Sequence, residues 1–143
     1  MGAITATLLP MLKQTFPERA MRAGTPPDPV ATFPAAHPDV GDLRIWDEGD
    51  EATVAIGEIT HSHFNPYDSS LSADQIAARV SAEIVDFLED LFADRVLLWS
   101  SGIAGSGGWQ QIPANAPPQF MGSNARTYHW SGPIPNPLAD GAS

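Results

Sequence analysis

Hydrophobic and polar residues alternate in two neighbouring segments of the chain, residues 42–47 and 52–60. The apolar positions on one side are Leu43, Ile45, Val54 and Ile56. A period of two is typical of a strand with one buried face. The run between the segments, residues 47–51, contains a glycine, as hairpin turns commonly do. The pattern therefore predicts a β-hairpin.

A different period follows the hairpin. Ser72 and Gln75 stand at the N-cap and N3 positions of a capping box. Apolar residues then recur at helical spacing, at Ile76, Val80, Ile84, Phe87, Leu88 and Leu91. Such spacing places them on one face of a helix, with acidic residues on the other face. We expect a long amphipathic helix over residues 73–94.

Two further strands complete the predicted core. Residues 96–100 form an apolar run of strand length, and residues 109–112 follow a Gly-rich segment over 102–108. The predicted order is β-β-α-β-β. Strands joined by hairpins on both sides of one helix indicate an α+β fold, with a small antiparallel sheet and the helix packed on one of its faces.

Prolines are concentrated outside this core. Because proline cannot donate to a strand ladder or continue a helix, we expect Pro-rich N- and C-terminal arms. The chain divides into an N-terminal arm over residues 1–38, an α+β core domain over 39–112, and a Pro- and aromatic-rich tail over 113–143. Within the first arm we expect a short helix near residues 5–15 and an extended, polyproline-like loop over 24–38.

Charge distinguishes the core from the arms. The 143 residues carry a net charge of −10, and residues 39–95 hold fourteen acidic residues against three arginines. This acidity disfavours a nucleic-acid partner, which requires a basic surface. The absence of cysteine excludes disulfides and thiolate metal sites. No segment is apolar enough for a membrane span, so we expect a soluble, cytoplasmic protein.

The predicted hairpin turn is the most acidic local feature. Asp47, Glu48, Asp50 and Glu51 crowd its tip, and Trp46 lies beside it on the strand face opposite the core. Four carboxylates on one loop repel one another, so the tip must face water or a cationic partner. We interpret these five residues as a candidate docking surface for a basic protein.

The segment 57–68 carries the residues best suited to catalysis or metal binding. His61 and His63 are two apart on a strand, so both side chains can point to one ion. Asp68, or Glu58 as the alternative, could add a carboxylate for a divalent transition metal. The segment resembles the first cupin motif, in which a glycine precedes His-x-His and an acidic residue follows. Its glycine-to-histidine spacing is shorter and a long helix follows, so we expect no cupin barrel.

Trp99 and Trp109 flank the second hairpin. We expect them to pair across strands and to line a pocket.

Three functions remain open. The leading hypothesis is a non-enzymatic interaction module that binds a basic protein, similar in profile to bacterial toxin-neutralising immunity proteins and other acidic mimic proteins, with no cofactor. The first alternative is a metal-dependent or acid–base enzyme built on His61 and His63. The second is a self-assembling structural protein, a homo-oligomer joined through its Pro-rich arms.

Overall fold

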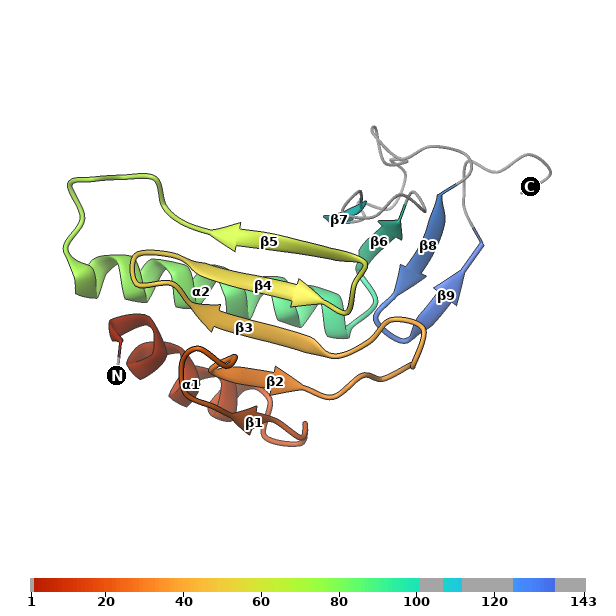
Figure 1. Ribbon diagram of the computed structural model, residues 1–143, viewed down its shortest axis with the longest axis horizontal. Coiled ribbons are helices and arrows are strands. Elements are labelled where there is room, and N and C mark those ends of the chain that lie inside the picture. The colour runs from red at the N-terminus through yellow and green to blue at the C-terminus, as the bar shows by residue number, and fades with distance from the viewer. Residues whose placement is uncertain (1, 101–106, 112–124, 136–143) are drawn as a thin grey trace.

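The computed structural model describes residues 2–100, 107–111 and 125–135. The described residues form two helices and two antiparallel sheets (Figure 1). The elements are α1 (Ala3–Thr15), β1 (Arg22–Ala23), β2 (Ala31–Phe33), β3 (Leu43–Asp47), β4 (Ala52–Ile56), β5 (Thr60–Phe64), α2 (Ala73–Phe92), β6 (Val96–Ser100), β7 (Gly107–Gln111), β8 (Arg126–His129) and β9 (Gly132–Ile134). The α+β class agrees with the sequence. The single sheet in β-β-α-β-β order does not, because the strands divide into two sheets. The short helix expected near residues 5–15 forms as α1, and it joins the core.

The first sheet has the strand order β1-β2-β3-β4-β5 and contains the predicted hairpin. In β3 and β4 the register places Leu43 opposite Ile56 and Ile45 opposite Val54, and all four side chains are buried. Because buried apolar residues alternate with more exposed residues along both strands, one face of the hairpin is apolar and packs against the helices. The other face carries Arg44, Trp46, His61 and His63, and it is open.

Helix α2 lies against the closed face of this sheet (Figure 1). Its capping box forms as predicted: the Gln75 amide donates to Ser72 Oγ at 3.2 Å, and the Ser72 amide donates to Gln75 Oε1 at 2.8 Å. The expected apolar stripe is buried from Val80 to Leu91. Just beyond the helix, Asp94 has a φ of 59° and accepts hydrogen bonds from the amide and hydroxyl of Ser131. The helix end is therefore tied to the turn between β8 and β9.

The N-terminal segment is part of the core, in contrast to the predicted extended loop. Helix α1 packs along α2, and β2 is buried at all three positions. Phe33 in β2 contacts the ring of Phe92 at a centroid distance of 5.3 Å, and Phe16 contacts the same ring at 5.1 Å. This aromatic cluster joins the N-terminal segment to the end of α2.

The second sheet has the strand order β7-β6-β8-β9. The hairpin of β6 and β7 was predicted, but β8 and β9 arise from the segment expected to be a tail. Thr127 lies opposite both Trp99 and Ile134, and its hydroxyl donates to the Ile134 carbonyl at 2.8 Å. Strand pairs thus cross both predicted boundaries, at residues 38 and 112, although the three-part division itself stays a prediction. Neither α1 nor α2 combines the length and apolar character that a membrane span requires.

Candidate functional site

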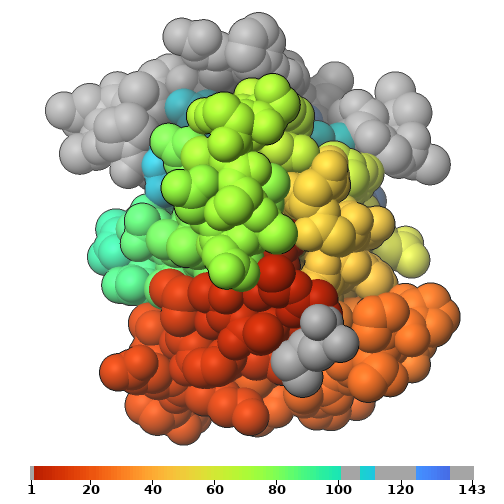
Figure 2. Space-filling view, turned by 90° about the vertical axis from the view of Figure 1, so that its left-hand side faces the viewer, coloured from red at the N-terminus to blue at the C-terminus, as the bar shows by residue number. Residues whose placement is uncertain are grey.

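One end of the molecule brings together the start of α1, the turn between β3 and β4, and the loop between β5 and α2 (Figure 2). Exposed side chains there include Glu48, Asp50, Tyr67, Asp68 and Asp74. We call the surface formed by these five residues the acidic end. It combines Glu48 and Asp50 of the predicted docking turn with Tyr67 and Asp68 of the β5–α2 loop and Asp74 of α2, and of these last three the sequence singled out only Asp68, as a candidate metal ligand.

Asp47 has a structural role at this end of the molecule. Its Oδ2 accepts hydrogen bonds from the Thr5 amide at 3.1 Å and from the Thr5 hydroxyl at 2.6 Å. Its Oδ1 accepts from the Gly49 amide at 2.8 Å. Thr5 lies in the first turn of α1, where amides lack helical partners and negative charge is favourable. The carboxylate therefore caps α1 from the neighbouring sheet, in place of the side-chain cap that Gly2 cannot supply.

Glu51 is also held by neighbouring side chains. Its Oε2 lies 2.9 Å from His63 Nδ1, and its Oε1 accepts a hydrogen bond from Asn65 Nδ2 at 3.3 Å. The same histidine nitrogen lies 3.0 Å from Thr53 Oγ1. These contacts fix the His63 ring on the open face of the sheet. Of the four predicted tip carboxylates, Glu48 and Asp50 are the exposed ones.

The predicted metal ligands are only partly brought together. The rings of His61 and His63 meet edge to face with centroids 5.5 Å apart, as their strand spacing predicted. In the part of the chain that the structure describes, no group of three or more His, Asp or Glu is arranged to hold a metal ion. Asp68 instead bonds to Ser70 in the loop, so a set of His61, His63 and Asp68 is not assembled.

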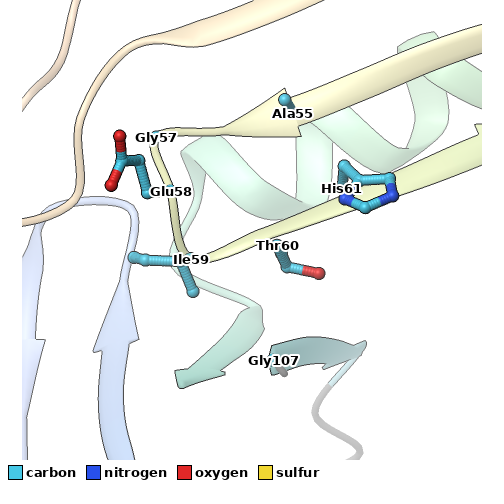
Figure 3. Close-up of a pocket in the computed structure, with 7 residues that line it drawn as sticks. All are labelled: Ala55, Gly57, Glu58, Ile59, Thr60, His61 and Gly107. Carbon is cyan, nitrogen blue, oxygen red and sulfur yellow. The ribbon is translucent and has the colours of Figure 1, made fainter. Parts of the chain in front are cut away.

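Glu58 and His61 line one small pocket beside Gly107 (Figure 3). The Glu58 carboxylate and the His61 ring lie at opposite ends of it. Its volume is about 130 Å³. Pockets that bind small-molecule ligands usually enclose roughly 300–1,000 Å³. The pocket therefore offers room for a few water molecules beside the imidazole and is smaller than a usual substrate pocket.

Local hydrogen bonds hold the loop between β5 and α2 on both sides of Tyr67. The Tyr67 amide donates to Asn65 Oδ1 at 2.7 Å, and the Ser70 amide and hydroxyl donate to Asp68 Oδ1 at 3.0 and 2.6 Å. The hydroxyl and the amide of Ser70 lower the pKa of Asp68 below its ordinary value because they stabilise the carboxylate, and Arg79 adds a smaller coulombic effect. The loop is thus fixed by its own polar side chains.

Tyr67 itself is presented to solvent. Its φ is 53°, a left-handed conformation that bulky residues rarely adopt. Its side chain is 81% exposed, and Tyr67 is the only large hydrophobic residue so exposed in the described ranges. Asn65, Pro66 and Asp68 are residue types typical of turns, but nothing in the sequence indicates that the loop projects an aromatic ring.

The tryptophans do not form the predicted pocket. Trp99 lies opposite Gly108, and Trp109 lies opposite Leu98, so the two indoles occupy opposite faces of the second sheet. Trp109 contacts Phe87 at a centroid distance of 4.5 Å and donates from Nε1 to Ser62 Oγ, which links the two sheets. Most of the Gly-rich segment predicted over 102–108 lies outside the described residues.

Acidic side chains continue from the acidic end along the outer face of α2. The exposed carboxylates of the helix are Asp74, Glu83, Asp86 and Glu89. Arg79 is the one basic residue within the helix. The molecule therefore presents a negative surface that runs from the hairpin turn over the helix.

No protein-family model, curated protein or solved structure matches the chain. The function proposed below therefore rests on the geometry of the molecule.

Proposed function

We propose that the protein is a non-enzymatic interaction module that binds a basic protein through the acidic end. The observation that carries the proposal is Tyr67, an exposed aromatic side chain held in a left-handed conformation beside exposed carboxylates. Strained backbone conformations persist where the surrounding structure maintains them, and they cluster at functional sites. Tyrosine is also among the residues that most often dominate binding energy at protein interfaces.

The ordered loop lowers the entropic cost of burying the Tyr67 side chain at an interface. Asn65 and Asp68 already hold the backbone on both sides of Tyr67 through local hydrogen bonds. A residue that is ordered before binding loses less conformational freedom when a partner covers it. Tyr67 can then contribute apolar contact, a hydroxyl, and a ring face for an arginine or lysine of the partner.

The charge of the surface selects the class of partner. Asp68 adjoins the tyrosine, Glu48 and Asp50 are exposed on the β3–β4 turn at the same end of the molecule, and the outer face of α2 adds further exposed carboxylates. Such a field attracts a basic protein during diffusion and repels acidic ones. A toxin or another basic enzyme that is held inactive by an acidic binder has the required chemistry, which is the basis for an immunity- or mimic-like role.

The proposal is tested by capture from extracts of the cells that make the protein, followed by affinity measurement with the captured protein. A charge-reversal pair, Glu48→Lys with Asp50→Lys, removes two exposed carboxylates and leaves Asp47 and Glu51 in their structural contacts. Tyr67→Ala removes the aromatic side chain. We expect Tyr67→Ala to weaken binding by about 2 kcal/mol, roughly thirtyfold in Kd. The charge pair should slow association at low salt.

The matched control is Glu83→Lys with Asp86→Lys, which makes the same change in net charge on the middle of α2. Binding that is retained by the control and lost by the acidic-end variants supports the proposal. Equal weakening by both charge pairs would show a nonspecific field effect and remove the assignment of the site. If no basic protein is recovered at low salt, the proposal should be abandoned.

A further inference from the structure

A second polar concavity lies where the two sheets meet, away from the acidic end. Its volume is about 690 Å³. It is lined by the connection from β2 to β3, by the turn from β4 to β5, and by β6 and β8. Figure 1 shows the β2–β3 connection approaching β8 and β9 at this end of the molecule. We call it the inter-sheet groove, and we define it by Asp39, Arg44, Glu58, Arg126 and Tyr128.

The groove brings two arginines together with three acidic residues, Asp39, Asp42 and Glu58. Arg44 from the first sheet and Arg126 from the second both line it and are exposed, and they are two of only seven basic residues in the chain. Elsewhere, Arg95 pairs with Asp90 at 2.9 Å, and Arg19 lies over the ring of Phe92. For Arg44 and Arg126, the described residues provide no carboxylate within 4.0 Å.

Among the described residues these guanidinium groups have no ion-pair partner, although carboxylates line the same groove. Asp42 is engaged, because its Oδ1 accepts a hydrogen bond from the Ala35 amide at 2.8 Å. Asp39 and Glu58 are exposed at the groove. A guanidinium group matches the geometry of a carboxylate or phosphate, and two of them in one concavity are suited to hold such a group.

Backbone geometry opens one wall of the groove. Gly41 and Gly57 line it with φ values of 89° and 51°, and a Cβ on Gly41 would lie 2.7 Å from the Gly57 Cα. Two strand ends approach this closely only because neither residue has a side chain. This part of the wall therefore carries no side chain that would reduce the volume of the groove.

We propose that the inter-sheet groove binds a small zwitterion, with its carboxylate at Arg44 and Arg126 and its cationic group toward Asp39 and Glu58. The volume suits a ligand of the size of an amino acid or short peptide. The carboxylates of Asp39 and Glu58 in the same groove disfavour a multiply charged anion such as phosphate, since like charges repel. The Tyr128 hydroxyl adds a neutral donor from the second sheet.

The experiment follows the side-chain Nε–Hε resonances of the six arginines by NMR at constant ionic strength. The probe is the dipeptide alanyl-alanine, compared with its C-terminal amide, with acetate and with inorganic phosphate. We expect saturable shifts at Arg44 and Arg126 with the dipeptide, and none with the amide. Arg44→Gln or Arg126→Gln should raise the Kd of the dipeptide about tenfold.

Arg79→Gln is the matched control, because it removes an exposed arginine from α2 and leaves the groove intact. Equal Kd values in this control and in the wild type are expected. Shifts that stay linear, or that occur equally at all arginines, would overturn the site. Tighter saturation by inorganic phosphate than by the dipeptide would overturn the zwitterion. None of these outcomes depends on the protein partner of the acidic end.

Discussion

Asp47 shows how one carboxylate of a turn can be structural while Glu48 and Asp50 of the same turn stay exposed. It bonds to the amide and hydroxyl of Thr5 and to the Gly49 amide, whereas Glu48 and Asp50 face solvent. Gly2 permits this arrangement, because a Cβ at that position would overlap the Asp47 carboxylate. The four acidic residues look equivalent in the sequence, and a partner 42 positions away distinguishes one of them.

Replacing Asp47 by alanine should destabilise the protein. The substitution removes the cap on α1, and loss of such a cap usually costs about 1 kcal/mol. Urea denaturation of the wild type and Asp47→Ala would measure the difference. Asp50→Ala is the control, since Asp50 is exposed on the same turn and should change stability by less than about 0.5 kcal/mol. Identical midpoints for the wild type and both variants would contradict the capping role.

Asp68 provides a test of the loop that presents Tyr67. Its pKa is lowered chiefly by the Ser70 hydroxyl and then by the Ser70 amide. Ser70→Ala removes the first contact and keeps the second, so the pKa of Asp68 should rise toward its ordinary value in an NMR pH titration. Because the folded-state pKa is the lower one, this contact stabilises the loop above the unfolded-state pKa and is lost as the pH falls through the folded-state pKa. An unchanged pKa in Ser70→Ala, with Ser69→Ala as the reference, would mean that the loop is not fixed this way.

At the scale of elements, β2 determines whether the N-terminal segment is an arm or part of the core. All three of its residues are buried, and Phe33 packs against the rings of Phe16 and Phe92. A surface arm would tolerate truncation of such a side chain, whereas a core strand would not. The segment is therefore expected to unfold together with the rest of the protein.

Phe33→Ala should cost about 3–5 kcal/mol, because it removes a fully buried aromatic ring and leaves a cavity. Thermal and chemical denaturation would both show the loss, and Phe33→Leu should recover part of it. Ala36→Ser, at an exposed position three residues later, should be close to neutral. A neutral Phe33→Ala variant would show that residues 1–38 are an arm after all.

Local patterns were sufficient for some elements and insufficient for others. The capping box of Ser72 and Gln75 and the alternation in β3 and β4 are encoded within a few residues, so they were predictable. Strands β2 and β9 have three residues each, too few for a periodic signal, and they are recognisable only by their pairing with β1, β3 and β8. The second sheet also depends on the pairing of β6 with β8, which are not consecutive in the sequence. The prolines near these strands favoured irregular structure in the sequence interpretation.

For the whole molecule, the distribution of charge matters more than its sum. Exposed carboxylates occupy the acidic end and the outer face of α2, and two exposed arginines line the inter-sheet groove. The net charge of −10 predicted the acidic surface but gave no indication of the groove. Arg44 and Arg126 are 82 positions apart in the sequence, and they line one groove only because the two sheets lie side by side. Sequence reasoning could therefore identify the acidic surface but not the groove.

The acidic face of α2 should be a cost to stability. Asp86 lies three residues from both Glu83 and Glu89, at spacings where like charges repel on a helix. Asp86→Lys replaces this repulsion by attraction and should raise the free energy of unfolding by a few tenths of a kcal/mol at low salt. The gain should shrink as salt increases. Lower stability of Asp86→Lys at low salt would contradict repulsion as the dominant effect.

The bond between Asp47 and Thr5 affects how contacts with this protein should be mapped. Amide hydrogen exchange reports every opening that a partner suppresses, including openings away from the contact. A partner that immobilises the β3–β4 turn will also immobilise the Asp47 carboxylate, which accepts a hydrogen bond from the Thr5 amide. Exchange would then slow in the first turn of α1 even where the partner touches none of its residues. Protection of α1 should therefore be interpreted as an effect transmitted through Asp47 and not as direct contact with the partner. The exception would be a result in which Asp47→Ala abolishes binding of the partner.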